Sequence, residues 1–216
     1  RMTMNQSEMD MIERIFSATD NLMAVEGLPN LSMHKIAKAA KISPGTIYIY
    51  FKNKEELLAQ FARHIFLSFQ RAMEKDHDET QSFAEQYRKM WWNIWHFLQE
   101  NPTILSNMNQ YRSLPGFLET CKEMEHSCWD QFCLKGQAAN VLANLEPRIL
   151  FLLSLDTAIV LASDNKFLGI AVTDVVLESV IERSWRAIPF LQEKFNLPRR
   201  LYRHVIAAAY PHESKI

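Results

Sequence analysis

The chain has 216 residues, of which 48% are hydrophobic and 23% are charged, and its formal net charge is −1. This composition is typical of a globular protein, and the near-neutral charge excludes a generally polycationic nucleic-acid binder, so that any DNA contact must be local. Only 5 glycines occur, and no run of alternating β-branched residues is present, which favours an all-helical fold.

Membrane and secretory segments are not expected. No apolar run approaches the roughly 18 residues of a membrane span, because even the segment 149–162 contains Ser154 and Asp156. The start of the chain lacks the basic and apolar regions of a secretory signal. Its 3 cysteines form no disulfide framework and are typical of a reducing compartment. We therefore expect a cytoplasmic protein with no membrane partner.

The first predicted helix covers residues 7–25, where apolar residues recur at helical spacing. Ser7 and Asp10 resemble a capping box at its start. Gly27 can adopt the left-handed conformation that ends a helix, and Pro29 prevents continuation.

Two short helices and a longer one are predicted next. Ser32 is expected to cap a helix over 33–40, and Ser43 to cap another after a tight turn. Asn53 is expected to cap a fourth helix, over 54–73, which links the first part of the chain to the rest.

The remaining chain also reads as helical. A polar break over 75–79 separates the two parts, and prolines or glycines mark the later turns. Helices are predicted over 80–100, 102–112, 117–135, 148–162, 173–190 and 198–210.

Residues 32–54 carry a purely cationic set of charges. This stretch contains no carboxylate and five lysines, namely Lys35, Lys38, Lys41, Lys52 and Lys54. A local cationic face on a small helical unit is typical of a protein that binds the phosphate backbone of DNA. The alternative is a helical hairpin whose lysines are merely solvated.

The same stretch has the features of a helix-turn-helix. Ala37 allows the first helix to pack closely on the second, and Ile47 and Phe51 are expected to point inward. The second helix then presents its outward side chains to the major groove, and these are Thr46, Tyr48 and Tyr50. Tyrosine hydroxyls can donate hydrogen bonds to phosphate oxygens.

Residues 45–58, Gly-Thr-Ile-Tyr-Ile-Tyr-Phe-Lys-Asn-Lys-Glu-Glu-Leu-Leu, resemble the signature of the tetracycline-repressor (TetR) family of bacterial transcription regulators. Residues 31–37 resemble the start of the family's second helix. The resemblance covers about residues 7–65. It implies a DNA-binding domain over 1–55, linked by the helix 54–73 to a ligand-binding and dimerisation domain within 56–216.

The resemblance further implies a repressor that binds a palindromic double-stranded DNA operator as a homodimer and dissociates when a small hydrophobic or aromatic inducer binds. The positions that match DNA contacts of the family are Ser32, His34, Lys35, Gly45, Thr46, Tyr48, Tyr50 and Lys54. Among these, Gly45 and Thr46 match base-approaching positions, and His34 stands where some relatives carry arginine.

An aromatic cluster is the candidate inducer pocket. Trp91 and Trp95 share a helix face, and a ligand site is usually apolar with a few polar groups. The candidate lining is Trp91, Trp92, Trp95, Met108, Tyr111, Phe117 and Trp129. An aromatic stripe at helical spacing also suits an ordinary core.

The late apolar helices are the candidate dimer face, as the resemblance implies. The residues that could fill a four-helix seam are Leu152, Leu155, Ile159, Val176, Val180 and Trp185. Each could equally belong to the core of a single chain.

Other classes of function remain open. Cys121, His126, Cys128 and Cys133 could form a zinc or thiol-responsive site, although no C-x-x-C pair is present. A helical adaptor without DNA binding would share the fold. No phosphate loop, nucleophile elbow or metal-spaced His/Glu pair indicates an enzyme, and we expect no cofactor and no bound metal.

Overall fold

The computed structural model describes residues 5–123, 127–169 and 172–190, and the side chains of 166–168 are not described. The described part of the chain consists of α-helices, one short 3-10 helix and loops, with an isolated bridge between Leu142 and Pro189 but no strand. The all-helical fold class is therefore confirmed. Within these ranges, every helix is too short or too polar to cross a bilayer.

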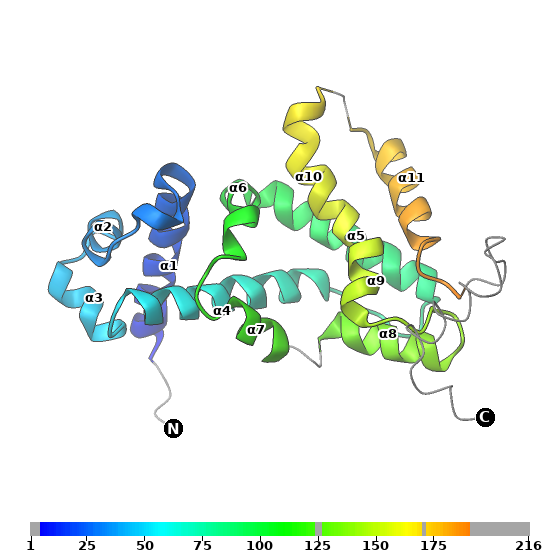
Figure 1. Cartoon of the computed structure of the whole chain (residues 1–216), viewed down its shortest axis with the longest axis horizontal. Helices are drawn as coiled ribbons and strands as arrows, with labels where there is room; N and C mark the ends of the chain where they lie inside the picture. The colour runs from blue at the N-terminus through cyan, green and yellow to red at the C-terminus, as the bar shows by residue number, and fades with distance from the viewer. Residues whose placement is uncertain (1–4, 124–126, 170–171, 191–216) are drawn as a thin grey trace, which may run out of the picture. The chain divides into compact units, whose positions relative to one another are not determined.

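The α-helices are labelled in Figure 1. The bounds of all the described helices are α1 (Gln6–Glu26), η1 (Leu28–Asn30), α2 (Met33–Ala39), α3 (Pro44–Tyr50), α4 (Lys54–Met73), α5 (Phe83–Glu100), α6 (Pro102–Tyr111), α7 (Phe117–Glu123), α8 (Cys128–Ala138), α9 (Pro147–Leu153), α10 (Asp156–Leu168) and α11 (Asp174–Trp185).

The chain forms two compact units. Unit 1 consists of Arg1–Ala72 and His96–Glu125, and unit 2 consists of Met73–Trp95 and His126–Ile216. Unit 1 thus joins the first four helices to α6 and α7, which come much later in the sequence. The functional boundary expected at residue 55 stays a prediction.

Helix α1 begins one residue earlier than expected because a different pair of residues caps it. The side chain of Asn5 accepts a hydrogen bond from the backbone N–H of Glu8 at 2.9 Å, and the Glu8 carboxylate accepts from the backbone N–H of Asn5 at 3.0 Å. This is a complete capping box, and Ser7 with Asp10 does not form it. At the other end, Gly27 has a φ of 82°, which ends the helix as predicted.

The core of unit 1 brings the helix-turn-helix and α6 together. Helices α1, α2 and α3 bury Phe16, Ile36 and Ile47, and α4 adds Phe61 to the same cluster. Tyr111 at the end of α6 belongs to it too, and its ring lies 6.2 Å from that of Phe61 in an edge-on arrangement. Helix α6 is therefore part of the same core as the helix-turn-helix.

Unit 2 differs from the sequence prediction in its helix boundaries. The helix expected over 148–162 is two helices, α9 and α10, because the backbone breaks at Ser154 and its hydroxyl bonds back to the carbonyl of Leu150 at 2.6 Å. The helix expected over 117–135 is likewise divided, into α7 in unit 1 and α8 in unit 2. The helix predicted over 198–210 lies outside the described residues.

Candidate nucleic-acid interface

Each short helix of the helix-turn-helix begins at the serine that the sequence predicted. The Ser32 hydroxyl accepts from the backbone N–H of Lys35 at 3.2 Å, and the Ser43 hydroxyl accepts from that of Thr46 at 3.1 Å. Each bond satisfies an amide that the first turn leaves without an intrahelical partner. Between the helices, Lys41 adopts a φ of 57°, a left-handed conformation uncommon for a residue with a side chain, so the turn is tight.

Helix α3 packs on the core with one face, and its other faces are partly or fully exposed. Ile47 is fully buried, and Phe51 directly after the helix is buried as well. Tyr48 is 49% exposed and Gly45 is exposed, while Thr46 is half-buried. We expected Tyr50 to point outward, but it is only partly exposed and packs against the core of unit 1. Its position on α3 lies closer to the buried face of the helix.

Both lysines that were predicted to contact DNA have partners within the protein. Lys35 forms an ion pair with Glu26 at 2.7 Å and also donates to the carbonyl of Asn30 at 3.1 Å. Lys54 donates to the carbonyl of Leu31 at 2.9 Å, which ties the start of α4 to the loop before α2. A phosphate would compete with these acceptors for the N–H groups of the two side chains.

Three further lysines of residues 32–54 were not among the predicted contact residues. Lys38, Lys41 and Lys52 are exposed, and none of them forms an ion pair within the described ranges. The sequence signal for them is the same absence of carboxylates over 32–54. His34 is exposed, and Ser32 is half-buried.

A buried polar network fastens α6 to α1. The carboxylate of Asp20 accepts from the Asn107 amide at 2.7 Å and from the Tyr111 hydroxyl at 2.7 Å, and Asn107 also donates to the carbonyl of Asp20 at 2.8 Å. One turn further, Gln110 accepts from the backbone N–H of Leu28 at 2.8 Å and donates to the carbonyl of Met23 at 3.2 Å. Hydrogen bonds shielded from water are strong, and a partner lost from such a network leaves a costly unsatisfied group.

Burial controls the ionisation of this network. Desolvation raises the pKa of Asp20, against the hydrogen bonds from Tyr111 and Asn107 and the nearby charge of His64, which lower it. The pKa of Tyr111 is raised by burial and by the adjacent Asp20 charge. No sequence pattern signals this network, because its members are separated by about 90 positions along the chain.

The predicted pocket residues are divided between the two units. Met108, Tyr111 and Phe117 belong to unit 1, whereas Trp91, Trp92, Trp95 and Trp129 belong to unit 2. Trp91 is fully buried, stacks on Trp95 with 5.9 Å between ring centroids, and donates to the Thr157 hydroxyl at 2.9 Å. These contacts place Trp91 and Trp95 in the core of unit 2, and the pocket assignment stays a prediction.

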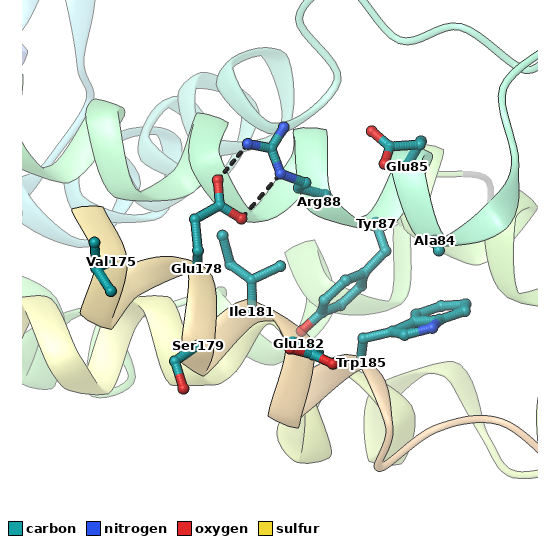
Figure 2. Close-up of a pocket in the computed structure, with 10 residues that line it drawn as sticks. All are labelled: Ala84, Glu85, Tyr87, Arg88, Val175, Glu178, Ser179, Ile181, Glu182 and Trp185. Carbon is teal, nitrogen blue, oxygen red and sulfur yellow. Dashed lines mark hydrogen bonds and ion pairs between the residues drawn. The ribbon is translucent and has the colours of Figure 1, made fainter.

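Unit 2 has an open groove of about 440 Å³ between α5 and α11, which the sequence did not indicate (Figure 2). The guanidinium of Arg88 donates to both carboxylate oxygens of Glu178, one of them at 3.0 Å. Trp185 lies against Tyr87 with 5.4 Å between ring centroids, and Tyr87 shares a 2.6 Å hydrogen bond with Ser184.

The predicted dimer residues differ in exposure. Leu152 and Val176 are exposed, Ile159 and Val180 are half-buried, and Leu155 is fully buried within unit 2. Trp185 lines the groove of Figure 2. Other large apolar side chains exposed on the same three helices are Ile149, Leu153, Val160 and Val175. Several apolar side chains are thus available on α9, α10 and α11.

The cysteines are divided between the two units. Cys121 belongs to unit 1, whereas Cys128 and Cys133 belong to unit 2, and His126 lies outside the described residues. Burial raises the pKa of the Cys128 thiol to about 11 and raises that of Cys133 as well. Both thiols are therefore protonated near neutral pH, which disfavours metal binding and redox reactivity.

Comparison with known families matches most of the chain. The model of bacterial regulatory proteins of the tetR family matches residues 15–61, and that of a tetracyclin repressor-like C-terminal domain matches residues 82–189. An uncharacterized HTH-type transcriptional regulator of Haemophilus influenzae is 60% identical over 185 residues, which cover 86% of this chain and 99% of the relative.

Solved structures give the same result. The crystal structure of a TetR-family transcriptional regulator from H. influenzae is 60% identical and superposes with a TM-score of 0.82, covering 86% of this chain and 100% of the other. A putative TetR-family regulator from Vibrio parahaemolyticus is 31% identical with a TM-score of 0.73, covering 83% and 98%. A regulator from Bacillus subtilis in complex with stearoyl-CoA shares the fold at 22% identity, with a TM-score of 0.61 over 82% and 98%.

Proposed function

Because the chain belongs to the TetR family of bacterial DNA-binding transcriptional regulators, we propose that it is a homodimeric repressor whose inducer releases it from a palindromic operator. Each protomer places α3 in a major groove, and the two grooves lie about one helical turn apart on the same side of the DNA.

The observation that carries this proposal is the surface of residues 32–54, from the cap of α2 to the first residue of α4. Its buried residues, such as Ile36 and Ile47, hold the helices together, while its five lysines are exposed and the stretch contains no carboxylate. A cationic surface of this kind gains affinity by releasing the counterions condensed on DNA.

Each predicted residue has a role in this arrangement. Gly45 allows α3 to approach the bases closely, and Thr46 lies beside it. The hydroxyls of Tyr48 and Tyr50, with Ser32, His34, Lys35 and Lys54, bind the phosphates on either side of the groove and fix the register. Lys35 and Lys54 are held near their positions by Glu26 and Leu31 before DNA arrives, which reduces the entropy lost on binding.

The dimer is proposed to form through α9, α10 and α11. The exposed apolar side chains of these helices, including Leu152, Val176 and Val160, lose contact with water when a second copy covers them. Leu155 contributes from beneath, because it supports the helix surface from the core.

Inducer binding is proposed to act through α6. Asn107, Gln110 and Tyr111 bond α6 to α1 and to the loop after it, so a ligand that displaces α6 also displaces the helix-turn-helix. A ligand that prefers the displaced conformer shifts the population away from the spacing that fits two successive grooves. The proposed inducer is a small hydrophobic or aromatic molecule. The relatives are transcriptional regulators, and no catalytic role is proposed for this chain.

Binding to the DNA upstream of the chain's own gene tests the repressor. In an anisotropy titration at fixed salt, wild-type protein should bind that DNA more tightly than an unrelated duplex. Tyr48→Ala and Lys54→Ala should each weaken binding about tenfold or more, since each removes a charged or charge-assisted contact. Lys122→Ala, at an exposed lysine on α7, is the matched control and should bind normally. Equal binding by all the variants would contradict the proposal.

A thermal-shift screen tests the inducer. Acyl compounds, lipophilic cations and flat aromatic molecules are compared, and a compound that raises the melting temperature should also release the operator. A compound that stabilises the protein but leaves operator affinity unchanged would contradict the proposed coupling, because coupling between two sites is reciprocal.

A further inference from the structure

Helix α3 exposes an apolar side chain that the fold does not use. Ile49 is 78% exposed, although both its neighbours in the sequence are tyrosines and the surrounding surface is cationic. Most of its side chain therefore contributes nothing to the core of unit 1. A solvated isoleucine also lacks the stabilisation that full burial of such a side chain provides.

The position of Ile49 on the helix places it toward DNA. Successive residues of an α-helix turn by about 100°, so Gly45 and Ile49 lie on nearly the same face, and both lie almost opposite to Ile47. Ile47 is fully buried, which fixes that opposite face as the outermost surface of α3. At Gly45 an added Cβ would meet only the Ser43 hydroxyl, at 3.8 Å, so the surface there is open.

This outermost face has little hydrogen-bonding capacity of its own. Gly45 has no side chain, and the Thr46 hydroxyl shares a 2.7 Å hydrogen bond with the Ser43 hydroxyl. Tyr48 lies about 100° round the helix from Ile49, toward one flank, where a phosphate is the nearer partner. The side chain best placed to reach a base edge is thus apolar.

The major groove offers one apolar feature, the 5-methyl group of thymine, which cytosine and both purines lack. We propose that Ile49 is a specificity-determining residue that packs against a thymine methyl in each half-site of the operator. The inference rests on the proposed placement of α3 in the major groove. The hydrogen bonds and lysines around it supply affinity for any sequence, and Ile49 selects thymine at one position.

The test removes methyl groups from both partners. An operator is first selected from random duplexes by the wild-type protein, and each thymine of a half-site is then replaced by deoxyuridine, which differs only in lacking the 5-methyl group. At one thymine, the replacement should weaken wild-type binding about fourfold per half-site, or about fifteenfold in both half-sites, the value expected for one buried carbon group each. Every other deoxyuridine should change the affinity less than about twofold.

The variant Ile49→Ala completes the cycle. It should bind the thymine operator at least about tenfold more weakly than wild type, and it should no longer distinguish thymine from deoxyuridine at the selected position. Because the side chain is exposed, the variant should retain the wild-type melting temperature. Leu118→Ala is the matched control, since Leu118 is 68% exposed on α7, and it should retain the full thymine preference.

Three outcomes would overturn the inference. Equal loss of affinity by Ile49→Ala on the thymine and deoxyuridine operators would place Ile49 against the sugar-phosphate backbone. Unchanged binding by Ile49→Ala would show that the side chain does not touch DNA. A wild-type protein that binds its selected operator but is indifferent to every deoxyuridine would exclude methyl recognition, whereas a failure to select any operator would instead refute the proposed function.

Discussion

The sequence predicted functional residues both in helix α3 and in the tryptophan segment of α5. The two segments differ in how far these side chains are buried. In α3, Ile47 is buried in the core, while Tyr48 and Ile49 remain largely exposed. In α5, Trp91 and Trp95 are buried in the core, and Trp91 donates a hydrogen bond to the Thr157 hydroxyl. A side chain that stability does not require is the better candidate for function.

The comparison explains why one kind of signal is more informative than the other. The signature over 45–58 combines a cap, a turn and a lysine-rich face, and the packing of a core does not require these features together. A stripe of tryptophans at helical spacing also satisfies the needs of a core, because aromatic side chains supply much of its buried area. Four substitutions or measurements test this contrast.

Substitution of Trp91 should have the largest effect. Trp91→Ala should lower the free energy of unfolding by about 3–5 kcal/mol, because it leaves a large cavity and removes the hydrogen bond to the Thr157 hydroxyl. Urea unfolding followed by circular dichroism measures this. Tyr48→Ala is the paired variant and should change stability by less than about 0.5 kcal/mol while weakening operator binding. A mild Trp91→Ala would indicate that the segment is an adaptable pocket.

The network between α1 and α6 should give a smaller effect. Tyr111→Phe removes the hydroxyl that donates to Asp20 and should cost about 1–3 kcal/mol, since the buried carboxylate loses a partner. It should also reduce the effect of an inducer on operator affinity. Normal stability with normal inducer response would show that this hydrogen bond does not link the two helices.

The raised pKa of Asp20 predicts a pH dependence of stability. The folded protein holds the Asp20 proton at a pH where the unfolded chain has released it, so this group stabilises the fold most at low pH. The stability of wild type relative to Asp20→Asn should fall as pH rises from about 4 toward neutrality, because the asparagine side chain of the variant keeps an acceptor oxygen but carries no charge. Parallel pH profiles for the two proteins would contradict the assignment.

The ion pair in the groove of unit 2 should contribute least. Arg88 and Glu178 are both substantially exposed, so Arg88→Ala should cost only about 0.2–1 kcal/mol in urea unfolding. Glu178→Gln is the control, since it removes the charge but can still accept from Trp92. A loss above about 2 kcal/mol would mean that the pair is shielded in the assembled protein, as a covered dimer face would shield it.

Much of the fold could be predicted from local signals in the sequence. Ser32, Ser43 and Asn53 cap helices as their residue types suggest, because a cap depends only on neighbouring backbone amides. The break at Ser154 and the capping box at Asn5 were missed, since a largely apolar run over 149–162 and the pair Ser7 and Asp10 were equally plausible locally.

The site was only partly predictable for a different reason. The exposed set on α2 and α3 follows from helical periodicity, whereas the bonds from Asn107 and Tyr111 to Asp20 depend on how distant helices meet. Likewise, the bond from Lys54 to the carbonyl of Leu31 spans 23 positions and has no sequence signature. Long-range contacts of this kind require the tertiary structure.

The salt dependence of operator binding tests the central claim most directly. For wild type, the logarithm of the binding constant should fall linearly with the logarithm of the salt concentration. Lys35→Met should reduce the steepness by about 2 per dimer, since each protomer loses about one phosphate contact, while Lys122→Met should leave it unchanged. An identical slope for Lys35→Met and wild type would contradict the assignment of this surface to the DNA backbone.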